Sequence, residues 1–138
     1  MEKFQKIVVT GFIINEKKTL ILKRSNKETF LPGYWELPGG KLNFGEDPSS
    51  GLIREYQEEA GLHITVDKPF RTFSYLSRDG NRHTVEIVYM CSVEMGDVVM
   101  SEAHTEYAWI AEEAIEKYLI SKEMATSIRD GFRVFGKW

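Results

Sequence analysis

Three glutamates stand close together in the sequence, at positions 55, 58 and 59. If residues 48–60 form a helix with about 100° of rotation per residue, the three side chains share one sector roughly 100° wide. Carboxylates at helical neighbour spacing repel one another, and only Arg54 is near enough in sequence to offset them. A divalent cation would do so better, and oxygen ligands on a rigid helix suit Mg²⁺ or Mn²⁺. A solvated acidic helix is the alternative interpretation.

The residues before this segment favour the metal site. Gly39 and Gly40 follow a short strand-like segment, and glycine permits a backbone that can turn a carbonyl towards an ion. Glu46 precedes the expected helix, where it can favour the positive helix end and neighbour Arg54. A guanidinium beside the carboxylates would orient one of them and keep it ionised. The residues therefore predict a metal site for a phosphate-bearing substrate.

Apolar and β-branched segments indicate the elements that must position these side chains. Strands are expected over residues 6–14, 20–23, 34–37, 70–76, 84–93 and 106–111. Asp47 is a suitable N-cap, Pro48 suits the first helical position, and Gly61 would end the helix after Ala60. Residues 112–130 are expected to be helical, in two pieces. These elements predict a single α+β domain over residues 1–138.

Composition excludes several classes of protein. Of the 138 residues, 42% are hydrophobic and 28% charged, which is typical of a globular chain and not of a collagen-like or disordered one. A single cysteine, Cys91, allows no internal disulfide and favours a reducing compartment. We expect no signal peptide and no membrane span, and hence a cytoplasmic protein. The net charge of -3 makes a nucleic-acid partner an unfavoured interpretation. The aromatic segment 132–138 could cap the core or join two chains, which leaves a homodimer open.

Residues 40–62 resemble the Nudix box. That pattern requires a glycine, a glutamate six residues later, then Arg-Glu, Glu-Glu and a final glycine at fixed spacing. The matching positions here are Gly40, Glu46, Arg54, Glu55, Glu58, Glu59 and Gly61. Tyr56, where an aliphatic residue is usual, is the one departure. Residues 35–40 and 107–110 also resemble the flanking segments of this family.

The resemblance implies a Nudix fold, which is an α/β/α sandwich around a mixed sheet with the box as a loop-helix-loop. It implies a MutT-like hydrolase that cleaves a nucleoside triphosphate to a monophosphate and pyrophosphate, by attack of a metal-activated water. The implied ligands of Mg²⁺ or Mn²⁺ are the Gly40 carbonyl, Glu55 and Glu59, assisted by Glu58. Arg54 and Glu46 would orient them. Glu55 is our choice of general base, with a distal glutamate as the competitor.

The distal acid departs from the pattern. Relatives often carry a Glu-His pair before the tryptophan that corresponds to Trp109, and the expected glutamate position here holds Ala103, followed by His104. Glu102 could take that role if the loop shifts by one residue, and Glu106 is the second choice. Either could equally be a solvated loop acid.

The substrate is less constrained by the sequence. By analogy with nucleotide-hydrolysing relatives, Arg24 could contact a phosphate or base, and Trp35 could stack on a base, as could Tyr75 or Tyr89. The alternative for each is a solvated arginine or a core aromatic. A nucleotide substrate is expected, and signatures of other branches are absent from the matching positions. The alternatives left open are a nucleotide-sugar, ADP-ribose or dinucleotide pyrophosphatase, and a non-catalytic Nudix-fold binding or sensing module.

Overall fold

The computed structural model describes residues 2–94 and 96–136, and its strands form two sheets. The four-stranded sheet has the order β4-β1-β6-β5, in which β1 and β6 run parallel and the other pairs antiparallel. The antiparallel three-stranded sheet has the order β3-β2-β7. The strands are β1 (Phe4–Phe12), β2 (Thr19–Arg24), β3 (Trp35–Glu36), β4 (Gly39–Lys41), β5 (Ile64–Leu76), β6 (Arg82–Val93) and β7 (His104–Ile110). The helices are α1 (Pro48–Ala60), the 3-10 helix η1 (Glu112–Lys117) and α2 (Lys122–Phe135).

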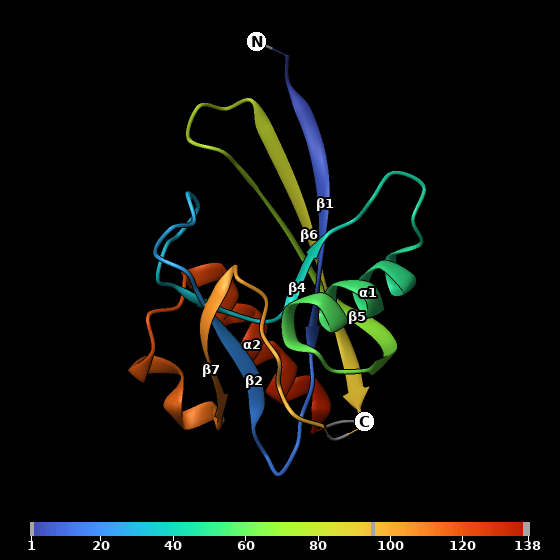
Figure 1. Cartoon of the computed structure of the whole chain (residues 1–138), viewed down its shortest axis with the longest axis vertical. Coiled ribbons are helices and arrows are strands. Elements are labelled where there is room, and N and C mark those ends of the chain that lie inside the picture. The colour runs from blue at the N-terminus through green and yellow to red at the C-terminus, as the bar shows by residue number, and fades with distance from the viewer. Residues whose placement is uncertain (1, 95, 137–138) are drawn as a thin grey trace.

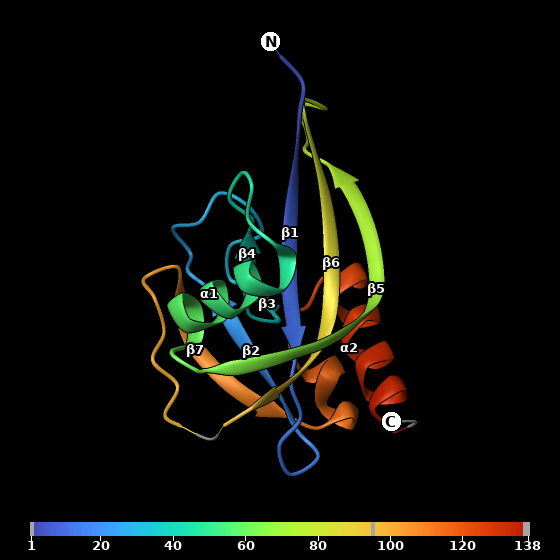
Figure 2. The same ribbon diagram turned by 90° about the vertical axis from the view of Figure 1, so that its right-hand side faces the viewer.

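The two α-helices lie on opposite sides of the four-stranded sheet, as Figures 1 and 2 show. The alternation of side chains along β1 and at Ile13, which follows it, explains this arrangement. Val9 and Ile13 belong to the apolar cluster that includes Leu52 of α1, whereas Phe12 belongs to the cluster that includes Ile128 of α2. A mixed sheet with helices on both sides is the α/β/α arrangement predicted from the sequence.

The ends of α1 match the expected signals. Asp47 is the N-cap and accepts hydrogen bonds from the backbone N–H groups of Ser49 and Ser50, at 3.1 and 3.4 Å. Pro48 begins the helix, and Gly61 ends it with a left-handed φ of 69°. These local signals fix the helix ends and therefore which residues face the site.

Most of the expected strands shift by one or two residues at an end, and three differences are larger. β5 begins at Ile64 rather than at residue 70, so that Pro69 lies within the strand. The proline is tolerated because β5 is an edge strand, where a missing backbone N–H need not break a pair of strands. The register of β5 with β6 shifts on both sides of Pro69. Gly39–Lys41, which is not among the expected strands, is strand β4, paired with β1. The C-terminal helix extends to Phe135 rather than ending at residue 130.

The segment after β7 covers the α2 side of the core. The ring of Phe132 packs edge-to-face on Phe12, with 5.1 Å between the ring centroids. Phe135 is 49% exposed, and Lys137 and Trp138 lie outside the described residues.

No helix in the described part of the chain is both long and apolar enough to cross a bilayer.

Candidate active site

Arg54 connects the acidic residues at the start and middle of α1. Its Nε and Nη2 donate to the two carboxylate oxygens of Glu46, each at 2.8 Å. Its Nη1 donates to Glu55 at 2.9 Å and to both oxygens of Glu58 at 3.2 Å. These bonds raise the pKa of Arg54 further, and the bond from Arg54 is the main reason that the pKa of Glu46 falls to about 2. The structure thus brings together four residues that the sequence predicted for the site.

Gly39 and Gly40, which precede α1, have other atoms so close to their Cα atoms that no side chain fits. A Cβ on Gly40 would lie 2.1 Å from a carboxylate oxygen of Glu55, and one on Gly39 would lie 2.1 Å from the carbonyl oxygen of Val9. Any side chain at either position would therefore displace β1 or the Glu55 carboxylate. Burial raises the pKa of Glu55, and the hydrogen bond from Arg54 opposes that rise. The Gly40 backbone therefore lies beside the mostly buried carboxylate of Glu55, whose pKa is raised.

Glu59 points away from Arg54, towards the start of β7. His104 contacts it with Nδ1 at 2.8 Å, and contacts Glu36 with Nε2 at 2.9 Å. Ser101 also donates to Glu59, at 2.9 Å. Burial opposes the charged imidazole, but the two carboxylates outweigh it and raise the pKa of His104 to about 9. Burial alone would raise the pKa of Glu59, but the close contact with His104 and the hydrogen bond from Ser101 lower it overall.

His104 and Glu36 extend the site beyond the residues that the sequence predicted. The sequence is compatible with His104 as either a site residue or a loop residue, and it predicts no role for Glu36. Glu36 also accepts a hydrogen bond from Arg24, at 3.1 Å, so a chain of polar contacts runs from α1 through β7 and β3 to β2. The signal for Glu36 was its place between Trp35 and Leu37, because an acid inside an apolar strand needs a partner.

Glu102 and Glu106 lie apart from this network in the structure. Glu102 is exposed in the turn before β7, and Glu106 is exposed and forms an ion pair with Lys23 at 3.2 Å. Ala103 and His104, by contrast, both line the cavity described next. The role of Glu102 as a distal acid stays a prediction.

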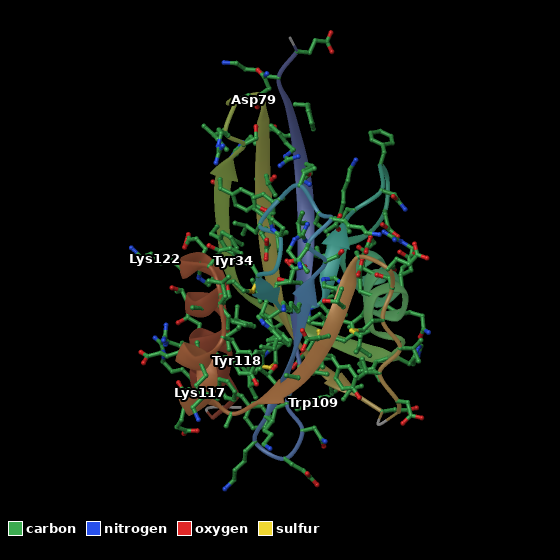
Figure 3. The ribbon with its side chains drawn as sticks, turned by 60° about the vertical axis from the view of Figure 1, so that its left-hand side comes forward. Tyr34, Asp79, Trp109, Lys117, Tyr118 and Lys122 are labelled. Carbon is green, nitrogen blue, oxygen red and sulfur yellow. The ribbon has the colours of Figure 1, made fainter. Side chains whose placement is uncertain are left out.

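A cavity of about 610 Å³ connects the acidic site to a group of aromatic rings. Gly40 and Glu59 line one part of it, and the predicted substrate residues Arg24 and Trp35 also line it, together with Tyr75. Figure 3 shows Tyr34 and Lys122, two further lining residues, at the N-terminal end of α2. The remaining stacking candidate, Tyr89, is buried in the cluster beneath α1.

Glu86 is a buried acid that was not predicted from the sequence as a site residue. It lies in the middle of β6, is 5% exposed, lines the cavity, and accepts a hydrogen bond from the Thr10 hydroxyl at 3.2 Å. Burial is the main reason that its pKa rises to about 7, and the nearby Glu36 charge adds to the rise. The available signal was a lone acid within the apolar segment 84–93.

Replacing Glu86 with glutamine should change how stability depends on pH. Because the folded state holds the Glu86 proton up to about pH 7, whereas an unfolded glutamate loses it near pH 4.5, stability falls as pH rises between these values. The penalty is about 3 kcal/mol above pH 7 at 1.36 kcal/mol per pKa unit. Urea unfolding should therefore show that the free energy of unfolding of Glu86→Gln, relative to that of the wild type, rises by about 3 kcal/mol between pH 4 and pH 8. The exposed Glu94→Gln is the control, and parallel curves for Glu86→Gln and wild type would contradict the assignment.

Comparison with known proteins decides the family. The model of the NUDIX domain matches residues 5–131. The chain belongs to the Nudix family. Its box is the loop-helix-loop around α1, and the Arg54 cluster described above lies within it.

Relatives place this Nudix protein on the MutT-like branch. "Nucleoside triphosphatase NudI" of Escherichia coli O81 (strain ED1a) is 27% identical over 136 residues, covering 91% of this chain and 95% of that protein. A "MutT-like protein" of Streptomyces ambofaciens is 28% identical over 112 residues, covering 80% and 67%. The crystal structure of the MutT protein from Methanosarcina mazei Go1 has a TM-score of 0.81 and 30% identity, covering 99% of this chain and 96% of the other. The protein is a Nudix hydrolase that acts on phosphoric anhydride bonds.

Proposed function

We propose that this Nudix hydrolase cleaves a nucleoside triphosphate to a nucleoside monophosphate and pyrophosphate, with Mg²⁺ or Mn²⁺ as its cofactor. The observation that carries the proposal is the cavity of about 610 Å³, which joins the box residues Gly40 and Glu59 to the aromatic residues Trp35 and Tyr75. Its volume is within the usual range for small-molecule sites. A phosphate chain at the glutamate end and a base among the aromatic rings would use both parts.

A group of neighbouring cations on the cavity wall supports a polyanionic substrate. Lys6, Lys41, Arg24 and Arg82 all line the cavity. Burial is the main cause that lowers the pKa of Lys6, and the charges of the other three lower it further. Cations that lie close enough to repel one another are stabilised when an anionic ligand binds between them. The proposed substrate is a free nucleotide handled by a single cytoplasmic domain, and the net charge of -3 agrees with a small molecule rather than a nucleic acid.

The donor set fits a hard divalent cation. The Gly40 carbonyl, Glu55, Glu58 and Glu59 offer only oxygen atoms, which Mg²⁺ and Mn²⁺ prefer. No ready-made group of three acidic, histidine or cysteine ligands occurs among the residues that the structure describes. Arg54 and His104 hold Glu58 and Glu59 in ion pairs, so metal binding would compete with these contacts. When bound, the ion would neutralise phosphate charge and acidify a water molecule.

The side chains have separate roles in this proposal. Glu55 accepts the proton of the attacking water, since its carboxylate is mostly buried and has a raised pKa. Arg54 holds Glu55 in place and is itself held by Glu46. Arg24 and Trp35 contact the nucleotide. Glu102 is the competing base, should its loop move towards the site.

Product analysis tests the proposal directly. The protein with Mg²⁺ is offered dGTP, 8-oxo-dGTP, other nucleoside triphosphates and ADP-ribose in parallel, with EDTA as the control. We expect a monophosphate and pyrophosphate from at least one triphosphate, and no products in EDTA. Cleavage of ADP-ribose or a dinucleotide alone would replace the proposal with the second type of pyrophosphatase. Tight binding of one nucleotide without turnover would identify a sensing module instead.

A further inference from the structure

Glu86 lies on the wall of the cavity, in a row of side chains that crosses the four-stranded sheet. Val8 of β1 and Phe73 of β5 are its direct partners in the strand register, so all three side chains lie on the same face of the sheet. All three line the cavity. Figure 2 shows β1, β6 and β5 side by side, with α2 on the face where this row lies. The carboxyl of Glu86 therefore faces the space that the substrate is proposed to occupy.

The Glu86 carboxyl has far fewer partners than its burial requires. The side chain is 5% exposed, and the hydroxyl of Thr10 is its one hydrogen-bond donor within residues 2–94 and 96–136. In the same described part of the chain no cation lies within ion-pair distance of Glu86. An ionised carboxylate can accept about four hydrogen bonds, and a buried one that lacks them is costly. The folded protein therefore presents unused acceptor capacity towards the cavity.

The position of Glu86 suits the base rather than the phosphates. Gly40 is on β4, and β1 separates β4 from β6 in the sheet. Two strand spacings of about 4.8 Å place β6 about 10 Å from β4, which is comparable with the length of an extended nucleotide from its phosphate to the far edge of its base. Phe73, beside Glu86, and Tyr75 stack with a centroid distance of 6.1 Å and supply aromatic surface there. A carboxylate at this end can accept a hydrogen bond from an N–H group of a base.

We propose that Glu86 determines base specificity by accepting a hydrogen bond from the exocyclic amino group of the substrate's nucleobase. Adenine, cytosine and guanine carry such a group. Uracil and thymine present ring carbonyls on both sides of their single N–H, and these oxygens would face the carboxylate with like partial charge. The inference rests on the proposed function, which it deepens by naming the class of base that the site selects.

The test compares substrates that differ at one amino group, in the wild type and in Glu86→Leu at pH 8, where Glu86 is ionised. The pairs are CTP with UTP and GTP with ITP, which lacks only the 2-amino group of GTP. We expect the wild type to have a higher kcat/KM for the amino-bearing member of at least one pair. Glu86→Leu should reduce the ratio of the two kcat/KM values about tenfold or more, mainly through KM, because it removes a hydrogen bond to a charged group. Glu86→Gln keeps a carbonyl acceptor and should retain part of the preference.

Controls separate recognition from a structural effect. Val88 is buried on the same strand, two residues away, and is not part of the cavity lining, so Val88→Ala should leave the ratio unchanged. Thermal unfolding establishes that each variant is folded. An equal loss for both members of each pair, an unchanged ratio in Glu86→Leu, or a wild type without preference would overturn the proposal.

A binding measurement distinguishes failure of this inference from failure of the proposed function. Calorimetry in EDTA compares CMP with UMP and GMP with IMP, and it requires neither metal nor turnover. Suppose that triphosphates are not cleaved, but that an amino-bearing monophosphate binds better than its partner and Glu86→Leu removes the difference. The proposed reaction is then wrong, whereas the role of Glu86 is supported. If neither monophosphate of either pair binds, the role of Glu86 is refuted.

Discussion

Replacing Glu59 with glutamine is expected to lower kcat/KM at least about a hundredfold, in line with losses seen when metal ligands or their partners are removed. The substitution keeps the size of the side chain but removes one anionic oxygen from the proposed ligand set. It also weakens the contact with His104, now 2.8 Å, and thereby the link between α1 and β7. Steady-state kinetics across a Mg²⁺ titration should show that excess metal restores part of the rate. Near-normal turnover would remove Glu59 from the set of ligands.

Glu102→Gln and Glu106→Gln are the matched comparisons for Glu59→Gln. All three variants exchange a carboxylate for an amide, and Glu102 and Glu106 are both exposed in the structure. If the loop before β7 moves so that Glu102 reaches the site, Glu102→Gln will slow turnover sharply. If Glu106→Gln is the damaging substitution, the choice of Glu102 is wrong. If both variants are active, Glu55 is left as the general base.

Replacing Arg54 with glutamine is expected to lower turnover at least about tenfold and to move the acidic limb of the pH–rate profile to higher pH. Arg54 donates to Glu46, Glu55 and Glu58. Burial already raises the pKa of Glu55, and Arg54 is the main group that opposes the rise. Without it the carboxylate would take up its proton at a higher pH, because an opposite charge favours the ionised form. The kcat/KM profile between pH 5 and pH 9 measures this shift.

Arg54→Lys is the control for the geometry of the guanidinium. Lysine keeps the positive charge but cannot form the two parallel bonds that Arg54 makes to Glu46, so it should retain the pH profile better than the rate. A lower rate with an unmoved acidic limb in Arg54→Gln would mean that Arg54 only supports the fold. Mg²⁺ should raise the thermal stability of Arg54→Gln more than that of the wild type, because it would replace the missing counter-charge.

Local signals in the sequence were sufficient for the helix that carries the proposed ligands. The N-cap Asp47, Pro48 and the left-handed Gly61 act through bonds within a few residues, and the helical period alone places Glu55 and Glu59 in one sector. The strands were less well determined at their ends. Pairing with β1 makes Gly39–Lys41 a strand, and the edge position of β5 lets it continue through Pro69. Such partners are far away in sequence, so local composition does not reveal them.

The partners of the site residues were decided by the tertiary structure. The sequence alone determined the Nudix family, the acidic helix and the pairing of Glu46 with Arg54, because these depend on fixed spacing within one segment. It could not show that His104 bridges Glu36 and Glu59, or that Glu86 faces the cavity. These contacts join residues of different strands and helices, and they exist only once two sheets and α2 enclose a common space. Spacing along the chain orients side chains within one element, whereas packing between elements decides which of them meet.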